Sequence, residues 1–281
     1  MSTLNARMLY LYAITPIHSG VGQAASVIDL PIAREKSTGW PIIPSSTLKG
    51  VLRDASQDKE ANDWINIAFG DQNRAGAIAF GDQRILCLPV RSYFGTFAYV
   101  TCPLSLTRLL RDANALAVEA PFPAEIPNIS GVSVLLTSES VLINENKIYL
   151  EDLDLNRNEG NADAIATGLA NEIFTDEMEK TGFVKRFVIV SDEVFNFLSE
   201  TATEVKARIS LKDDTKTVIT GGLWYEEAVP AEAIFAGPIL LTDHARRNGP
   251  SNLLDRIEGG LIQIGGHASV GCGLCRMVVG K

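Results

Sequence analysis

Apolar residues along this chain recur at two spacings, which predict strands and helices respectively. Residues 7–15 carry apolar side chains on both faces of an alternating pattern, which is typical of a central strand. Residues 103–117 repeat leucine at helical spacing behind a proline at the first position, which predicts an amphipathic helix. Its inward side chains would be Leu106, Leu109, Leu110 and Leu116, with Arg108 and Arg111 outward.

The same patterns divide most of the chain into short elements. We expect a helix over 46–57, two strands within 76–89 separated by Gly81-Asp82, and a strand over 92–101. The order strand, helix, strand, strand, helix, strand predicts an α+β fold with a ferredoxin-like or RRM-like core. Further on we expect strands at 132–143, 148–150, 183–190 and 234–242, helices at 164–180, 192–200 (capped by Ser191) and 252–258, and a last strand to Val279.

Two β-branched runs at 205–211 and 215–220 flank Lys212-Asp213-Asp214, which predicts a hairpin. Lys206 and Arg208 contribute to its basic character. A plain edge hairpin of the sheet is the simpler interpretation. Similarly, Trp224 and Tyr225, which follow it, are by residue type ordinary core aromatics.

The chain is long enough for one large core, and its charge is unevenly distributed. It has 281 residues, of which 46% are hydrophobic, and a formal net charge of −9. Residues 139–180 hold eleven acidic and three basic residues, a net of −8 (3 − 11), which we interpret as a solvated acidic face. The remainder is nearly neutral, so the overall acidity does not exclude a nucleic-acid partner. Without a signal-peptide pattern or an apolar window of membrane length, we expect a cytoplasmic protein with no membrane partner.

The cysteines predict packed, reduced thiols. Cys87, Cys102, Cys272 and Cys275 are too few and too scattered for a disulfide framework. The last two have the spacing of half a zinc knuckle, but only His267 offers a further ligand nearby, so no structural zinc is expected.

Residues 18–53 form a locally basic segment with a local net charge of +2. The loop over 16–41 is long and partly apolar, so we expect it to be ordered, in part through contact with another chain. After Pro44 a helix should begin, capped by Ser45 or Ser46, with Lys49 and Arg53 on one face of its first turns. A helix start with free N–H groups and nearby cations is a site for phosphate.

A second candidate phosphate contact lies in the glycine-rich stretch over 261–273. Backbone N–H groups of such a loop can approach a polyanion closely, although glycine also serves tight turns. The glycines concerned are Gly265, Gly266, Gly271 and Gly273.

Several of these stretches together resemble one family. Residues 43–53, IPSSTLKGVLR, resemble the IPGSSLKGALR signature of the RAMP superfamily, the Cas7-type backbone subunits of CRISPR effector complexes, with Ser45 in place of glycine. Residues 29–35 (DLPIARE), 221–227 (GGLWYEE) and the glycine-rich loop resemble the type III-B members, although His267 and Ala268 stand where acidic residues are common. The resemblance implies a single Cas7-type RAMP domain over 1–281, with an insertion at about 118–180 and a thumb hairpin at about 203–222.

The resemblance also implies a function. Such a subunit oligomerises along the crRNA with other copies of itself and other subunits of the complex, and cleaves complementary target RNA at intervals of about six nucleotides. Cleavage would use a divalent metal, Mg²⁺ or Mn²⁺, held by Asp29, and attack of the ribose 2′-OH on the adjacent phosphate. His18 would assist as acid or base, Glu226 or Glu227 would supply a second carboxylate, and the hairpin would splay a target nucleotide. The RNA-binding residues would be Ser45, Ser46, Thr47, Lys49, Arg53, Lys206, Arg208 and the four glycines named above.

Other interpretations remain open at this point. From the residues alone, Asp29 is a loop carboxylate that caps a turn or pairs with Arg34. The chain could then be a non-catalytic Cas7-like subunit. It could also be a metal-independent endoribonuclease that processes the guide RNA, with His18 as general acid–base and the glycine-rich loop holding phosphate; this alternative predicts activity in EDTA.

Overall fold

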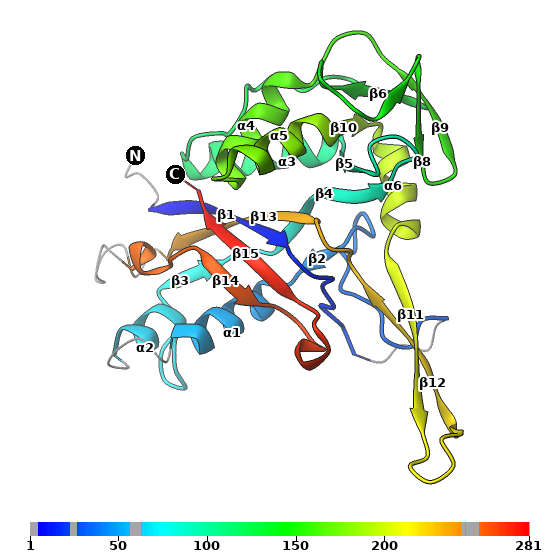
Figure 1. Ribbon diagram of the computed structural model, residues 1–281. Helices are drawn as coiled ribbons and strands as arrows, with labels where there is room; N and C mark the ends of the chain where they lie inside the picture. Colours follow the sequence, from blue (N-terminus) through cyan, green and yellow to red (C-terminus); the bar gives the residue numbers. More distant parts are fainter. Residues whose placement is uncertain (1–4, 23–26, 57–62, 243–244, 246–252, 281) are drawn as a thin grey trace.

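The computed structural model describes residues 5–22, 27–56, 63–242, 245 and 253–280. Its body is a mixed sheet with helices on both faces, from which one hairpin projects (Figure 1). The expected α+β RAMP fold is confirmed, and the hairpin belongs to a separate two-stranded sheet.

Four strands in the order β15-β1-β13-β4 form the centre of the sheet. β1 (Ala6–Ala13) lies antiparallel between β13 (Ile234–Leu241) and β15 (Leu274–Val279), and β13 pairs with β4 (Gln83–Arg91). This is the ferredoxin-like strand order, but its last two strands come from the C-terminal part of the chain. Local pattern does not show which strands pair, so the sequence alone did not indicate that β13 and β15 complete this core.

Alternation along β1 explains why both faces are covered. Leu9 and Leu11 pack into the same core cluster as helices α1 (Ser45–Ser56) and α2 (Asp63–Phe69). Met8 and Tyr10 face the opposite cluster, which includes α3 (Pro103–Leu116) and α4 (Asp163–Ile173). A strand buried on both sides carries apolar residues on both faces, as β1 does apart from Arg7 near its start.

The sheet continues beyond β4 through the middle of the chain. The path runs β4-β5-β10-β6-β9-β8-β7, with β10 parallel to β5 and β9 parallel to β6. The bounds are β5 (Phe97–Thr101), β10 (Phe187–Val190), β6 (Ser133–Leu136), β9 (Leu153–Arg157), β8 (Lys147–Leu150) and β7 (Ile143–Asn144). Short strands complete the edges: β2 (Ile42–Ile43), β3 (Ile78–Phe80) and β14 (Gly260–Gln263).

Several element boundaries differ from expectation for local reasons. The strand expected over 92–101 begins only at Phe97, because Gly95 and Thr96 adopt positive φ in a turn. The helix expected over 164–180 is two helices, α4 and α5 (Glu177–Arg186), so the next strand starts at Phe187. Helix α6 (Asp192–Thr201) begins as expected, with Ser191 accepting the N–H of Val194. A 3₁₀ turn, η1 (Leu254–Arg256), lies within the expected helix over 252–258, of which residue 252 lies outside the described part.

The projecting hairpin consists of β11 (Glu204–Leu211) and β12 (Val218–Ala228). The stretch 221–227 is therefore part of the returning strand rather than a segment after it. The hairpin belongs to no edge of the main sheet, and Tyr225 is 40% exposed, so the plain edge hairpin and the core-aromatic interpretation are both wrong. Within the described chain, no helix is long and apolar enough to cross a bilayer.

Candidate active site

The loop after β1 is fastened to the base of the hairpin by backbone hydrogen bonds. Ile17 and Val229 exchange two bonds, of 2.8 and 2.9 Å. Leu30 donates to the carbonyl of Tyr225 at 3.1 Å, and its own carbonyl accepts the N–H of Glu227 at 3.0 Å. The loop is thus ordered along β12 within its own chain.

Glu227 ties this loop down with its side chain. The carboxylate is 3% exposed and accepts from the Ile32 N–H at 3.1 Å, the Arg34 guanidinium at 2.5 Å and the Thr203 hydroxyl at 2.9 Å. All its oxygens are therefore engaged inside the protein. Arg34 pairs with Glu227 and not with Asp29.

Asp29 is held at the edge of β12 by one hydrogen bond. Its Oδ2 accepts the backbone N–H of Tyr225 at 2.8 Å. The other carboxylate oxygen makes no hydrogen bond or ion pair within the described residues. Asp29 lines a hollow of about 450 Å³ together with Glu226 and His267; the remaining lining residues are Leu30, Gly221, Leu223 and Trp224.

Glu226 lies on the hollow side of the hairpin and is itself tightly paired. Its oxygens accept from Trp224 Nε1 at 2.8 Å and Arg208 Nε at 3.0 Å. Burial acts to raise the pKa of this carboxyl, but the bonds from Trp224 and Arg208 and the nearby charges of His267 and Arg208 outweigh burial and hold the pKa below its usual range. Of the two neighbouring glutamates, only Glu226 therefore faces the hollow.

His267 also lines the hollow, although it was not among the catalytic residues expected from the sequence. Its Nε2 lies 3.7 Å from Glu226 Oε1, and its side chain is 29% exposed. It adopts a left-handed conformation (φ +64) at the head of a 3₁₀ turn, η2 (Ala268–Val270). In the sequence it stood out only as one further possible zinc ligand and as a departure from the acidic residue common in the family.

His18 lies behind His267 rather than in the hollow. It is 8% exposed, its Nδ1 is 2.6 Å from the Glu227 carbonyl, and its ring centroid is 4.8 Å from that of His267. A Cβ on Gly20 would approach its Nε2 to 2.6 Å. This packing leaves His18 poorly placed for the acid–base role expected of it.

The glycine-rich loop packs around His18, and three of its four glycine N–H groups are bonded within the chain. Gly266 donates to the His18 carbonyl at 2.9 Å, and Gly273 donates to Pro16 at 2.8 Å. Gly271 donates to Ala268 at 3.0 Å. At Gly265 (φ +82) a Cβ would lie 2.3 Å from the His18 carbonyl oxygen, so this close approach requires glycine. These contacts explain the glycines without a phosphate.

The start of α1 is capped differently from expectation. Ser45 and Ser46 lie inside the first turn, and the Ser45 N–H donates to the carboxylate of Asp82 at 2.8 Å. Thr47 donates to the Pro44 carbonyl. An anion thus already occupies this helix end, which weakens it as a phosphate site.

The two cations expected on one face of α1, Lys49 and Arg53, differ in their contacts. Arg53 donates to the Gly70 carbonyl at 2.5 Å and to Asn66 at 3.2 Å, which ties α1 to α2. Lys49 makes no ion pair within the described residues. On the hairpin, Lys206 is exposed and pairs with Glu204 at 2.5 Å.

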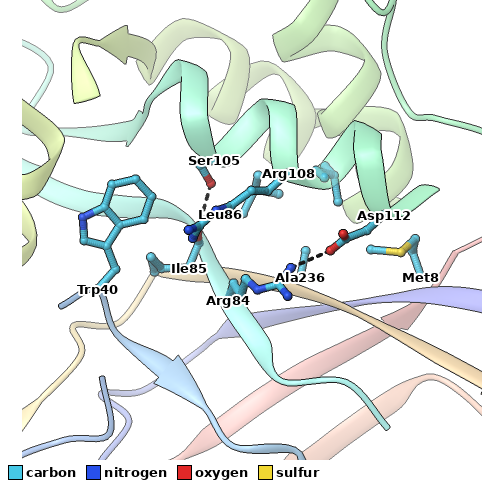
Figure 2. Close-up of a pocket in the computed structure, with 10 residues that line it drawn as sticks. Met8, Trp40, Arg84, Ile85, Leu86, Ser105, Arg108, Asp112 and Ala236 are labelled. Atoms are coloured by element: carbon cyan, nitrogen blue, oxygen red, sulfur yellow. Dashed lines mark hydrogen bonds and ion pairs between the residues drawn. The ribbon is translucent and has the colours of Figure 1, made fainter. Parts of the chain in front are cut away.

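A small interior hollow lies between β4 and α3 (Figure 2). Its volume of about 20 Å³ admits one water molecule, so it is a packing gap. Arg108, expected to point outward, stacks over Trp40 at 5.6 Å and pairs with Glu35 at 2.7 Å. Arg108 therefore points toward the loop residue Glu35 rather than into solvent, because the two charged side chains pair.

The potential metal ligands are limited. Among the described residues, no three His, Cys, Asp or Glu side chains cluster in a way that could hold an ion. Asp29 is the carboxylate of the hollow with an oxygen left over. Cys272 and Cys275 are buried, and the Cys275 Sγ donates to the Gly273 carbonyl.

Comparisons with known proteins agree with this architecture. The family model described as the RAMP superfamily matches residues 10–276, so the chain belongs to that superfamily. Within it, the chain belongs to the Cmr4 family. It is 37% identical to the CRISPR system Cmr endoribonuclease Cmr4 of Pyrococcus furiosus, over 98% of this chain and 96% of the relative.

Solved structures match over the same length. The crystal structure of oligomeric Cmr4 from Pyrococcus furiosus is 32% identical, with a TM-score of 0.77, covering 99% of this chain and 98% of that one. A chain of the type III-B Cmr-beta complex bound to cognate target RNA has a TM-score of 0.75 at 20% identity, covering 98% and 96% respectively, and shows that the fold is shared. The family resemblance in the sequence is confirmed.

Proposed function

We propose that this chain is the backbone subunit of a type III-B CRISPR ribonucleoprotein, which oligomerises along the crRNA and cleaves complementary target RNA. The observation that carries the proposal is the convergence of Asp29, Glu226 and His267 in one hollow at the base of a projecting hairpin. The relative from Pyrococcus furiosus, similar over its whole length, is named as an endoribonuclease of a CRISPR system.

The chemistry we propose is attack of a target ribose 2′-OH on the adjacent phosphate. Asp29 offers one engaged and one free carboxylate oxygen, so it can accept the 2′-OH proton or hold a cation. The hairpin would position the target nucleotide so that the 2′-oxygen lies in line with the departing 5′-oxygen. Glu227 would serve indirectly, by holding the loop that carries Asp29.

A divalent ion fits this hollow only together with the substrate. Mg²⁺ commonly uses one or two carboxylates, substrate phosphates and waters, and Asp29 supplies one such oxygen. Glu226 uses both its oxygens for Trp224 and Arg208. We therefore propose Asp29 and an RNA phosphate as the groups that hold Mg²⁺ or Mn²⁺, which when bound would neutralise the growing charge on phosphorus.

Self-assembly is supported by the apolar face of the hairpin. Residues opposite one another on paired strands share a face, and Ala207, Ile209 and Leu211 lie opposite Tyr225, Leu223 and Val218. Ile209 and Leu223 are 53% and 52% exposed. A contiguous exposed apolar surface of this kind calls for a covering partner, here another copy or stacked bases of the RNA. The relative whose structure is described as oligomeric has the same fold.

The contacts with RNA backbone would come from separate cations. The candidates are Lys49 on α1, which makes no ion pair within the described residues, and Lys206 on the hairpin, whose pair with Glu204 is exposed and therefore weak. Arg208 would act through Glu226, to which it is already bound. The metal-independent alternative relied on His18 and on free glycine N–H groups; the Nδ1 of His18 and the N–H groups of Gly266, Gly271 and Gly273 are engaged inside the chain, which favours the metal-dependent proposal.

The test compares the assembled ribonucleoprotein with an Asp29→Asn variant, which can still accept the Tyr225 N–H through its amide oxygen. Both are incubated with labelled complementary RNA in Mg²⁺. We expect a ladder of products about six nucleotides apart with the unaltered protein, and no products with the variant although it binds target equally. Asp213→Asn, in the exposed turn of the hairpin, is the matched control and should cut normally.

Three outcomes would contradict parts of the proposal. Equal cutting by Asp29→Asn would make Asp29 structural. Binding without cutting by the unaltered complex would identify a non-catalytic subunit, and full activity in EDTA would contradict the metal requirement.

A further inference from the structure

The hollow contains one residue, His267, to which the proposed function assigns no chemical role. His267 lines it beside Asp29, with its side chain 29% exposed and its Nε2 3.7 Å from Glu226. Glu226, the carboxylate nearest to the imidazole, is itself held in place by Trp224 and Arg208.

The backbone at His267 shows that this placement is specifically maintained. A residue other than glycine in the left-handed region is strained, and such strain persists where surrounding structure enforces it. Here the His267 carbonyl accepts the N–H groups of Val270 at 3.1 Å and Cys272 at 3.2 Å. The His18 ring packs against the imidazole, and His267, unlike His18, is among the residues that line the hollow.

The reaction proposed for this site needs a proton donor as well as a base. The 2′-oxygen forms a bond to phosphorus while the bond from phosphorus to the 5′-oxygen breaks. The 2′-OH proton leaves to Asp29 or to water, and the departing 5′-oxygen must gain a proton to become a hydroxyl. The products are a 2′,3′-cyclic phosphate and a 5′-OH end.

We infer that His267 is the residue that gives this proton to the 5′-oxygen, an inference that rests on the proposed function. An imidazolium loses the proton, becomes neutral imidazole and regains a proton from solvent after release. Imidazole is suited to this work because it exchanges protons near neutral pH. The charged and titratable groups around it are Asp29 in the hollow, Glu226 and Arg208 from the hairpin and His18 from the loop, and the last three are already bonded to partners inside the protein.

The test uses a target RNA in which sulfur replaces the 5′-oxygen at one cleavage position. A thiolate leaves without being protonated, so loss of the proton donor should not slow cleavage of this substrate. The variant is His267→Asn, because asparagine tolerates the left-handed conformation and preserves the turn. Asp29→Asn is run in parallel, and thermal unfolding of both variants is measured.

We expect His267→Asn to cut ordinary RNA about 100-fold more slowly than the unaltered complex, in line with the usual worth of general acid catalysis. It should cut the sulfur-containing RNA within about threefold of the unaltered rate. Asp29→Asn should fail on both substrates. An equal loss on both substrates by His267→Asn, or no loss on ordinary RNA, would overturn the role of His267 while leaving the ribonuclease intact. An unaltered complex that cuts neither substrate would instead refute the proposed function, and the inference with it.

Discussion

Glu227 is the more deeply buried of two adjacent glutamates, and we predict that its removal destabilises the fold. Glu227→Ala deletes three hydrogen bonds and leaves the Arg34 guanidinium without its carboxylate. Breaking a fully buried pair costs about 3–5 kcal/mol, but Arg34 is 25% exposed, so water relieves part of the penalty. We therefore expect a loss of about 2–3 kcal/mol in the free energy of unfolding, and a fall in Tm of about 4–8 °C for a chain of this size.

Urea unfolding of the isolated chain measures this loss. Glu204→Ala is the matched control, because Glu204 pairs with Lys206 on the same hairpin where both side chains are substantially exposed. An exposed pair contributes about 0–1 kcal/mol, so this control should unfold close to the unaltered protein. If Glu227→Ala and Glu204→Ala unfold at the same urea concentration, the reasoning about the buried carboxylate is refuted.

A double variant separates the destabilisation caused by the broken ion pair from that caused by lost side-chain volume. Arg34→Met combined with Glu227→Met replaces the pair with two apolar side chains of similar length. Such replacements of buried pairs are often neutral, so the double variant should be more stable than Glu227→Met alone. If the two destabilisations simply add, the residues are not coupled.

Three further predictions test other parts of the site. Because the pKa of Glu226 is depressed in the folded protein, this carboxylate stabilises the fold above the ordinary glutamate pKa of about 4.3. That contribution is lost as the pH falls through the lower folded pKa. In urea unfolding, the unaltered protein should therefore lose stability below about pH 4 relative to Glu226→Gln. Gly265→Ala should cost about 2 kcal/mol or more by the same method, whereas Gly271→Ala, at φ +86 with open space around it, should cost only about 1 kcal/mol. Ile209→Asn should leave the unfolding free energy within about 0.5 kcal/mol and weaken self-association in sedimentation velocity; unchanged association would show that this face is not the contact.

The elements that sequence predicted well are those whose pattern reflects burial directly. Residues 103–117 form the expected helix with its four leucines buried, and β1 is the central strand that its two apolar faces indicated. The hairpin was also visible, because its turn chemistry and alternation are local. In each case a few consecutive residues contain the whole signal.

The remaining features depend on partners far away in the chain. The cap of α1 comes from Asp82, and the partner of Arg34 is Glu227. The residues next to Ser45 and Arg34 in the sequence predict neither contact. The same applies to the strand order, since β1 pairs with strands more than 200 residues further on. A catalytic role for His267 was not predicted, because a single histidine in a glycine-rich loop suggests one only when Asp29 and Glu226 are known to lie beside it.

The geometry also links assembly to the site. The backbone N–H of Tyr225 holds Asp29, while the Tyr225 side chain, 40% exposed, lies on the apolar face of the hairpin. Covering that face with a neighbouring copy would restrict the strand that positions the carboxylate, whereas the isolated chain leaves the strand anchored only at its base. A site with one free carboxylate oxygen has little tolerance for such motion. The cleavage rate per subunit should therefore fall when the complex is diluted below its assembly concentration, even if each subunit still binds RNA.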